Sequence, residues 1–324
     1  MSTGPLVSVI IPTYNRASEF HRSVDSVVAQ TWRPLQLVLV NDGSTDNTSE
    51  AMTFIEPKVR DAGVEPLFIN QPNGGCASAR NTAVNRSTGA YFAFLDDDDE
   101  WLPTKIEKQV AEVQRTDADA CCTQARKLVT RGEIIQPPDP ANLIRGVNPG
   151  RYMDRTLDAH LITLLVARTM WEVVGEFDTD LKTGSDTEWI ARLSHYANFC
   201  AVPEILAVYT YSDTALSRID SMDAELARDA RRRLALEKIK QKCAHLPNWD
   251  EQAWRKRAAG AYSDFVKHLL YAGDLPSARR MYDEGMRITG AAEPLPGVKR
   301  KLRKAWWLSL VGKRLRHPKL RVRT

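Results

Sequence analysis

Four consecutive aspartates, Asp96 to Asp99, directly follow a short apolar run that ends at Leu95. Adjacent carboxylates repel one another unless a cation is present. Hard oxygen ligands select Mg²⁺ or Mn²⁺, and Mg²⁺ usually takes one or two protein carboxylates together with phosphate oxygens and water. The run therefore predicts a divalent-metal site for a phosphorylated ligand. The alternative, a solvated acidic loop, is disfavoured because apolar residues return at Trp101.

A further carboxylate, Asp42, follows the apolar segment 35–40. At the end of a buried strand it is well placed to accept a hydrogen bond from a nucleobase N–H. The sequence DGSTD (42–46) is equally suited to a turn or to capping a helix. On its own, Asp42 leaves both roles open.

Asp186 is the first residue of a helix expected at 186–196. A single positioned carboxylate there could take the proton of an attacking hydroxyl as a general base. An acidic residue at a helix start is also favoured by capping and by the helix dipole. His160, near Asp158, could contact an acceptor, although a structural histidine is the commoner case.

Four segments taken together resemble the successive motifs of family 2 glycosyltransferases with the GT-A fold. They are VSVIIPTYNR (7–16), VLVNDGSTDNT (38–48), GGCASARNTAV (74–84) and FLDDDDEWLPTKIE (94–107). The resemblance covers roughly residues 5–212, and the joint order and spacing are more specific than any single motif. It implies a metal-dependent, inverting transfer of a sugar from a nucleotide-sugar donor.

The resemblance also implies a role for each matching residue. Asp42 would read the base, with a UDP-sugar as the expected donor, and Asp186 would be the catalytic base. Mg²⁺ or Mn²⁺ would be held by Asp98, as the direct ligand, and by Asp96. The other donor-binding residues that it implies are Pro12, Thr13, Tyr14, Arg80, Asn81 and Asp97, together with Asp42 and Asp96.

Two positions depart from the family pattern. Ser185, in GEFDTDLKTGSDTEWIARL (175–193), stands where the family usually has Glu, and Thr210 stands where an Arg often follows Tyr209. These departures leave open a catalytically weak or inactive transferase that serves as a nucleotide-sugar-binding or membrane scaffold protein. Nucleotidyl transfer is less favoured, because PTYNR (12–16) offers no Gly-rich phosphate loop.

Apolar segments alternate with amphipathic segments through the first part of the chain. This alternation predicts an α/β fold, a doubly wound, mostly parallel sheet with ligands at the carboxyl ends of the strands. The resemblance makes it the GT-A (nucleotide-diphospho-sugar transferase) fold with a C-terminal helical extension. Strands are expected at 7–11, 35–40, 67–69 and 91–95, and helices at 18–30, 45–55, 77–85 and 103–114.

The later part of the chain is less regular. Residues 130–154 are rich in Pro, Gly and Asn, which predicts a long surface loop over the site. A strand is expected at 161–166 and two short strands within 199–211, around Pro203. Helices are expected at 221–243, 250–272 and 276–289. The expected domains are a catalytic domain at 1–218, divided into nucleotide-sugar-binding (1–115) and acceptor or catalytic (116–218) parts, a helical extension at 219–296 and a tail at 297–324.

Charge is concentrated in that tail. Eleven of the 45 basic residues lie between Lys299 and Arg323, and none of the 41 acidic residues follows Glu293. The apolar centre WWLSLV (306–311) between Lys and Arg residues is typical of an interfacial helix that meets anionic lipid. Nucleic-acid binding is less favoured because of the paired tryptophans, and a packing helix with a solvated end remains an alternative.

The five cysteines have no zinc-type spacing, and the chain's start reaches Pro12 too soon for a signal peptide. We therefore expect reduced thiols and a cytoplasmic protein, peripheral at the inner face of the plasma membrane if the tail docks there. The expected partners are a nucleotide-sugar donor and a glycan or lipid-linked acceptor in cell-surface polysaccharide synthesis, with no nucleic acid.

Overall fold

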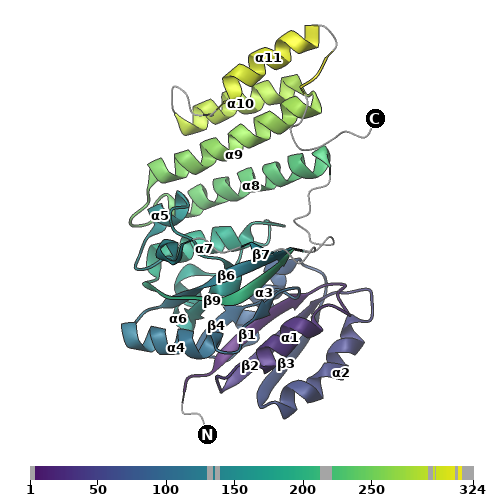
Figure 1. Ribbon diagram of the computed structural model, residues 1–324, viewed down its shortest axis with the longest axis vertical. Coiled ribbons are helices and arrows are strands. Elements are labelled where there is room, and N and C mark those ends of the chain that lie inside the picture. The colour runs from purple at the N-terminus through teal and green to yellow at the C-terminus, as the bar shows by residue number, and fades with distance from the viewer. Residues whose placement is uncertain are drawn as a thin grey trace. The chain divides into compact units, whose positions relative to one another are not determined.

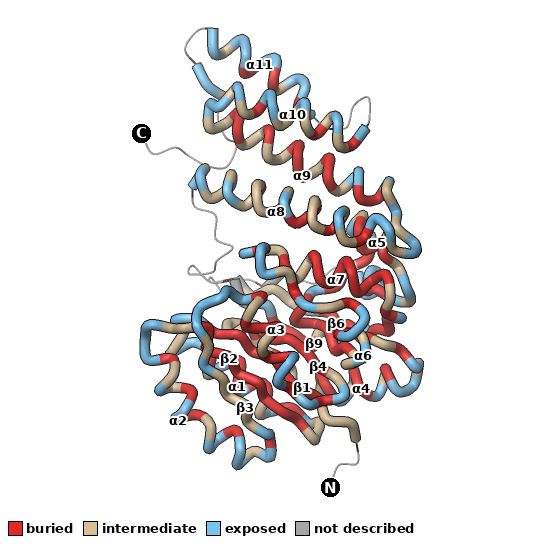
Figure 2. Tube along the Cα trace, turned by 180° about the vertical axis from the view of Figure 1, so that it is seen from behind, coloured by how far each residue is buried: buried red, intermediate tan, exposed pale blue. Residues whose placement is uncertain are grey.

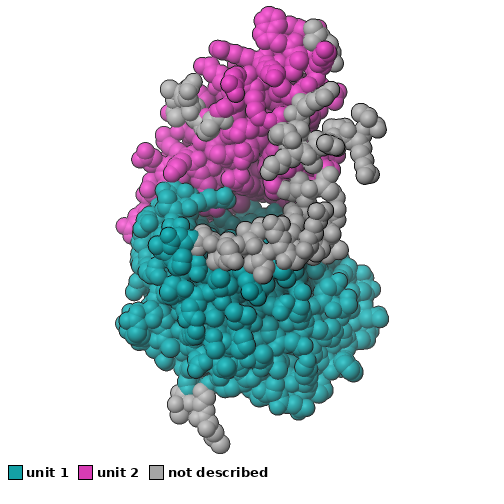
Figure 3. Space-filling model, in the orientation of Figure 1, with its two compact units in different colours: residues 1–213 teal, residues 214–324 magenta. Residues whose placement is uncertain are grey.

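The computed structural model describes residues 4–129, 134–135, 139–211, 221–290, 295, 297–310 and 313–315. Residues 1–213 and 214–324 form two compact units, which Figure 3 distinguishes by colour. Within the described ranges, no helix is long and apolar enough to span a membrane. The expected loop at 130–154 and tail at 297–324 lie partly outside the described residues.

The first half of the nine-stranded sheet is the parallel part that the sequence predicts. Its strands lie in the order β3-β2-β1-β4, each parallel to its neighbours. All of β1 and β2 is buried, as expected for strands covered on both faces (Figure 2). The strands are β1 (Val7–Thr13), β2 (Leu35–Asp42), β3 (Val64–Gln71) and β4 (Tyr91–Phe94).

Helices alternate with these strands and bury one apolar stripe each. In α4, for example, Ile106, Val110 and Val113 are buried at helical spacing. Helices α1 and α2 lie in front of the sheet in Figure 1. The four expected helices are confirmed as α1 (His21–Val28), α2 (Thr48–Asp61), α3 (Cys76–Arg86) and α4 (Lys105–Thr116).

The second half of the sheet is mixed. Strand β8 is antiparallel to both β4 and β6, while β6 is parallel to β9. The expected α/β class is confirmed, but the sheet is not mostly parallel, because four of the eight strand pairings are antiparallel. The strands are β5 (Glu100–Trp101), β6 (Ala120–Val129), β7 (Ile134–Ile135), β8 (Leu165–Ala167) and β9 (Phe199–Tyr211).

Two expectations in this half differ from the structure. The expected strand at 161–166 begins as a 3-10 helix, η2 (Leu161–Thr163), before β8. The two short strands expected around Pro203 are one strand, β9, because the register with β6 passes from Val202 directly to Ile205. The proline, which has no N–H to donate, is accommodated in this bulge.

The segment expected as a surface loop contains regular structure among its described residues. The 3-10 helix η1 (Pro140–Asn142) and helix α5 (Pro149–Met153) both begin at a proline, which suits the first helical turn. Two further helices follow, α6 (Arg168–Val174) and α7 (Ser185–Tyr196). The last of these is the helix expected at 186–196.

An aromatic cluster packs α6 and α7 against β4. Trp189 of α7 lies 5.8 Å from Phe94 and 5.0 Å from Phe177 between ring centroids, and its indole N–H donates to Gly175 O at 2.8 Å. Trp171 of α6 lies 5.9 Å from Phe92 of β4. Rigid aromatic packing of this kind fixes the start of α7, and therefore Asp186, relative to the sheet.

The second unit is entirely helical where it is described. The three expected helices are confirmed as α8 (Met222–Cys243), α9 (Glu251–Ala272) and α10 (Leu275–Thr289), and α11 (Val298–Leu310) follows. Ser221, Asp250 and Asp274 each cap a helix by accepting a backbone N–H. Helices α9, α10 and α11 share one apolar core.

Candidate active site

The ends of neighbouring parallel strands bring the predicted residues to one edge of the sheet. Thr13 ends β1, and the four aspartates follow β4, the strand beside it. The Thr13 hydroxyl donates to Asp97 Oδ2 at 2.8 Å. Pro12 is buried within β1, whereas the adjacent Tyr14 is 46% exposed. The exposed ring is accessible to a ligand, and donor binding by Tyr14 stays a prediction.

The carboxylates of the aspartate run point in different directions, because each has a different partner. Arg80 Nη2 of α3 donates to Asp96 Oδ1 at 2.6 Å, and Arg16 Nη1 lies 3.5 Å from Asp98 Oδ2. Asp99, which is fully buried, accepts the Thr210 backbone N–H at 2.8 Å. The loop is thus tied to α3, to β1 and to the end of β9.

Burial and mutual repulsion make these carboxylates reluctant to ionise without a ligand. Burial raises the pKa of Asp97 to about 7, against the hydrogen bond from Thr13. Burial, followed by the charge of Asp96, also raises the pKa of Asp98 and of Asp99. A cation would relieve this repulsion, so the oxygen-only ligand set fits Mg²⁺ or Mn²⁺.

Among the described residues, three buried polar atoms near this edge have no hydrogen-bond partner, while four others lie on α8 in the second unit. Within the described ranges, Gln71 Oε1, Arg80 Nε and Asp99 Oδ2 are buried and have no hydrogen-bond partner. Because a buried unpaired polar atom costs about 1–3 kcal/mol, such atoms are normally satisfied by water, an ion or a ligand. Their presence beside the aspartate run is consistent with a polar ligand at this site.

Asp42 has a structural role that the sequence left open. Its Oδ1 accepts from Gln71 Nε2 at 2.7 Å and from the Gly74 N–H at 2.9 Å, and its Oδ2 accepts from the Gly75 N–H at 2.7 Å. It therefore holds the glycine turn before α3. Since a carboxylate has about four acceptor positions, Oδ2 retains capacity for a base N–H, and base reading by Asp42 stays a prediction.

The turn after Asp42 requires glycine. Gly43 has φ +72°, and a Cβ there would lie 2.6 Å from the backbone nitrogen of Asn73. No side chain fits this close approach, so the two strand-end loops meet through backbone. The DGS sequence therefore forms a turn and also supplies the Asp42 carboxylate, which holds the glycine turn before α3.

Asn81 is engaged in a paired contact with another part of the chain. Its Nδ2 donates to Phe177 O at 3.0 Å, and its Oδ1 accepts the Phe177 N–H at 2.9 Å. Asn81 therefore fixes the turn that precedes α7. Its predicted contact with a donor stays a prediction.

Asp186 lies in the first turn of α7, partly exposed, and is electrostatically linked to the aspartate run through Arg80. Burial lowers the pKa of the Arg80 guanidinium, while Cys76, Asp96 and Asp186 raise it, and the net shift is upward. Arg80, only 6% exposed, is therefore paired with Asp96 and also lies in the electrostatic field of Asp186.

Two further cations contact the site and were not predicted. Arg22 of α1 donates through Nη2 to the carbonyl oxygen of Asp98 at 2.8 Å and to Thr210 Oγ1 at 3.1 Å. A guanidinium therefore reaches the position where the family pattern has its own arginine. Arg16 lies within the quoted motif PTYNR, but Arg22 carries no sequence signal, since an exposed helix position gives none.

His160, set aside on the sequence, also lies in this electrostatic environment. Its Nε2 is 3.2 Å from Asp158 Oδ2, and this hydrogen bond, with a further contribution from Asp186, raises the pKa of His160. A histidine within range of Asp186 could assist in placing an acceptor hydroxyl.

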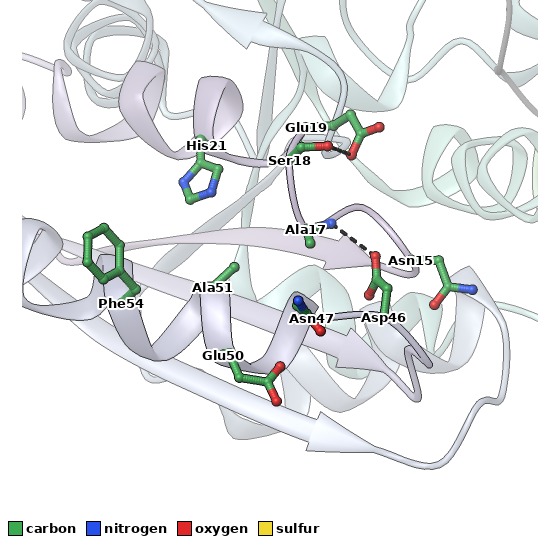
Figure 4. A pocket seen from close by; sticks show the side chains of 10 residues that line it. All are labelled: Asn15, Ala17, Ser18, Glu19, His21, Asp46, Asn47, Glu50, Ala51 and Phe54. Atoms are coloured by element: carbon green, nitrogen blue, oxygen red, sulfur yellow. Dashed lines mark hydrogen bonds between the residues drawn. The ribbon is translucent and has the colours of Figure 1, made fainter.

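A surface hollow of about 680 Å³ lies beside the loop after β1 (Figure 4). The Ala17 N–H donates to Asp46 Oδ2 at 3.3 Å on its wall. Its lining residues are Asn15, Ala17, Ser18, Glu19, His21, Asp46, Asn47, Glu50, Ala51 and Phe54. None of the four aspartates of the run and neither Asp42 nor Asp186 lines it.

A separate acidic group in the second unit is satisfied by ion pairs. Glu225, Asp229 and His268 have potential ligand atoms within 4.8 Å of one another. Arg228 contacts both carboxylates, and His268 Nδ1 lies 2.5 Å from Asp229 Oδ2. Arg228 offsets part of the charge of the two carboxylates, so the group resembles a partly buried ion-pair network.

Comparisons with known proteins agree on one family. The family model described as Glycosyl transferase family 2 matches residues 8–159. The chain is 31% identical over 194 residues to an uncharacterised glycosyltransferase of Rickettsia prowazekii, a match that covers 56% of each protein. The chain therefore spans little more than half the length of that relative.

Solved structures share the fold at low sequence identity. TarS 1–349 of S. aureus, in complex with UDP-GlcNAc, has a TM-score of 0.63 at 16% identity, over 95% of this chain and 92% of that one. The mannosyltransferase PcManGT of Pyrobaculum calidifontis, in complex with GDP-Man and Mn²⁺, has a TM-score of 0.60 at 18% identity, over 95% and 88%.

Proposed function

Because the chain belongs to glycosyl transferase family 2, we propose that it transfers a sugar, with inversion at the anomeric carbon, from a nucleoside diphosphate to a hydroxyl group. The donor is a UDP-sugar, and the acceptor is a glycan or lipid-linked sugar of a cell-surface polysaccharide. The fold-related TarS carries UDP-GlcNAc in its structure, which supports the uridine nucleotide.

The observation that carries this proposal is the ion pair of the buried Arg80 with Asp96, since the charge of Asp186 acts on the same guanidinium. An inverting displacement needs the leaving group and the base on opposite sides of the anomeric carbon. Arg80 contacts the loop proposed for the diphosphate and lies within range of the carboxylate proposed as the base.

Asp186 is the proposed general base. The acceptor oxygen forms a bond to the anomeric carbon while the bond from that carbon to the diphosphate oxygen breaks and its electron pair leaves with the nucleotide. The acceptor proton passes to the Asp186 carboxylate. Its partly exposed place in the first turn of α7 gives an acceptor access.

Asp96 and Asp98 are proposed to hold Mg²⁺ or Mn²⁺, and the bound ion would neutralise charge on the departing diphosphate. Arg16 and Arg80 hold these two carboxylates in place. Asp97 is fixed by Thr13 and Asp42 by the glycine turn, so the donor side of the site is preorganised around the ends of β1 and β2.

The basic residues between 299 and 323 support a place at the inner face of the plasma membrane, where anionic lipid attracts them. Such a location would bring the enzyme to a lipid-linked acceptor.

A donor panel tests the proposal. The full chain would be incubated with UDP-sugars and GDP-mannose, with Mn²⁺ or with EDTA, and the release of nucleoside diphosphate would be followed with and without glycan acceptors. We expect release from a UDP-sugar that EDTA abolishes. Turnover unchanged by EDTA contradicts the metal role, and tight UDP binding without release from any donor favours a nucleotide-sugar-binding scaffold instead.

A further inference from the structure

Helix α11 has more apolar surface than its packing uses. Val298, Leu302 and Ala305, at helical spacing, are buried in the core that α11 shares with α9 and α10. This stripe accounts for the docking of the helix within its unit. The remaining large apolar side chains of α11 lie outside this buried stripe.

Three of those remaining side chains are exposed together at the end of the helix. Trp306, Trp307 and Leu310 are 50%, 65% and 60% exposed, and the two indole rings meet edge to face at 5.0 Å. Single exposed apolar residues are ordinary, but adjacent tryptophans beside a leucine form a patch of the kind that marks an interaction site.

The two tryptophans also line a groove between α10 and α11. Its volume is about 980 Å³, which exceeds that of the hollow beside the loop after β1. Apolar and aromatic side chains alternate around it with basic ones. The lining residues are Leu275, Pro276, Arg279 and Tyr282 of α10, and Lys299, Leu302, Arg303, Trp306 and Trp307 of α11.

The charge of this groove is positive and largely uncompensated. Arg279 pairs with Asp283 at 3.2 Å, but across the described part of the chain no carboxylate forms an ion pair with Lys299 or Arg303. No acidic residue follows Glu293 in the sequence. An occupant of this groove would therefore be anionic at the rim and apolar at the centre.

We propose that the α10–α11 groove binds anionic phospholipid in a membrane surface, with Arg279, Lys299 and Arg303 at the phosphate groups and Trp306 and Trp307 at the boundary with the acyl chains. Tryptophan prefers this boundary because its ring is apolar and its N–H polar. The proposal sharpens the membrane part of the proposed function by adding α10 and a defined groove. It does not depend on the transfer reaction.

Vesicle binding of the full chain tests this site. Sedimentation would compare phosphatidylcholine vesicles with vesicles that also contain phosphatidylglycerol, at low and high salt. We expect binding to the anionic vesicles alone, weakened by salt, and roughly tenfold weaker in a Trp306→Ala/Trp307→Ala double variant or in Arg303→Glu. Brominated acyl chains should quench the fluorescence of the wild-type protein and not that of Trp306→Phe/Trp307→Phe.

Matched controls separate the groove from general charge and from folding. Arg287→Glu removes an exposed basic residue of α10 that does not line the groove, and Phe54→Ala removes an exposed aromatic residue of the other unit. Both should bind vesicles like wild type, and every variant should keep its UDP affinity. Equal binding by the groove variants and wild type overturns the proposal, as does preferential binding of a DNA or RNA oligonucleotide that the same substitutions abolish.

Discussion

Arg80 Nη2 lies 2.6 Å from Asp96 Oδ1, and the same guanidinium lies within electrostatic range of Asp186. Two carboxylates 90 positions apart in the sequence are therefore linked by one buried cation. The link follows from the fold, because α3 follows the glycine turn that Asp42 holds, and its Asn81 pairs with Phe177 in the segment before α7.

Removing the Arg80 guanidinium should lower the rate of turnover more than the stability of the fold. We expect Arg80→Ala to lower kcat/KM by roughly 10²-fold, because a charge-assisted contact at the proposed diphosphate is lost. Arg80→Lys should recover only part of the activity, since an ammonium cannot reproduce the planar fork. Steady-state kinetics would measure both, with Arg60→Ala on the exposed face of α2 as the control.

The raised pKa of Asp97, about 7, predicts a pH dependence of stability. An aspartate in the unfolded chain has a pKa near 3.9, so between about pH 4 and pH 7 the folded state retains a proton that the unfolded state has lost. Without metal, stability should fall as pH rises through this window. Thermal unfolding with EDTA at several pH values should show this fall in wild type and a smaller one in Asp97→Asn.

A bound metal ion should counteract the loss of stability at higher pH. A bound cation favours ionised carboxylates, so Mn²⁺ affinity should rise with pH. Calorimetric titration with MnCl₂ and UDP would measure it, and Asp98→Asn should weaken it at every pH. An Mn²⁺ affinity independent of pH and of Asp98 would count against the aspartate run as the metal site.

Arg22 should contribute to binding of the donor although about half of its side chain is exposed. Its contacts with the Asp98 carbonyl and the Thr210 hydroxyl place a cation where the family pattern has an arginine. Arg22→Ala should raise the KM for the donor roughly tenfold, as expected for one lost charge-assisted contact, while the unfolding midpoint changes little. A kcat and KM equal to those of Lys58→Ala, an exposed control, would show that Arg22 has no such role.

Asn81→Ala should destabilise the protein by about 2–3 kcal/mol, because two buried backbone groups of Phe177 lose their partner. Denaturant unfolding would measure this change. Asn47→Ala, at the exposed start of α2, where the asparagine side chain makes no capping hydrogen bond, is the matched control and should cost much less. Near-equal losses of unfolding free energy in the two variants would indicate that the hydrogen bonds to Phe177 do not account for the effect of Asn81→Ala.

Much of the fold could be predicted because its signals are local. The apolar runs of β1 and β2, the helical stripe of α4 and the capped helices α8, α9 and α10 are each encoded within their own segment. The sequence predicts two strands around Pro203, where the structure has one strand with a bulge. A proline interrupts the strand pattern in both cases, so the sequence does not distinguish a bulge from the end of a strand.

The sequence indicated the individual residues of the site better than the contacts between them. Strand-end motifs indicated Asp42, the aspartate run and Asp186, but nothing local indicates that Asn81 pairs with Phe177, 96 residues away, or that Asp42 holds the glycine turn. Arg22 was missed for the same reason. Contacts across the sheet depend on packing that the sequence does not display.

The most direct test of the proposed mechanism is the single-turnover release of UDP by Asp186→Asn in the presence of acceptor, compared with wild type and with Asp61→Asn, an exposed control on α2. Calorimetry on the same samples would establish that donor binding is intact. We predict a loss of roughly 10²- to 10⁴-fold in rate for Asp186→Asn alone, with unchanged donor affinity. A rate equal to that of wild type would contradict the role of Asp186 as the base.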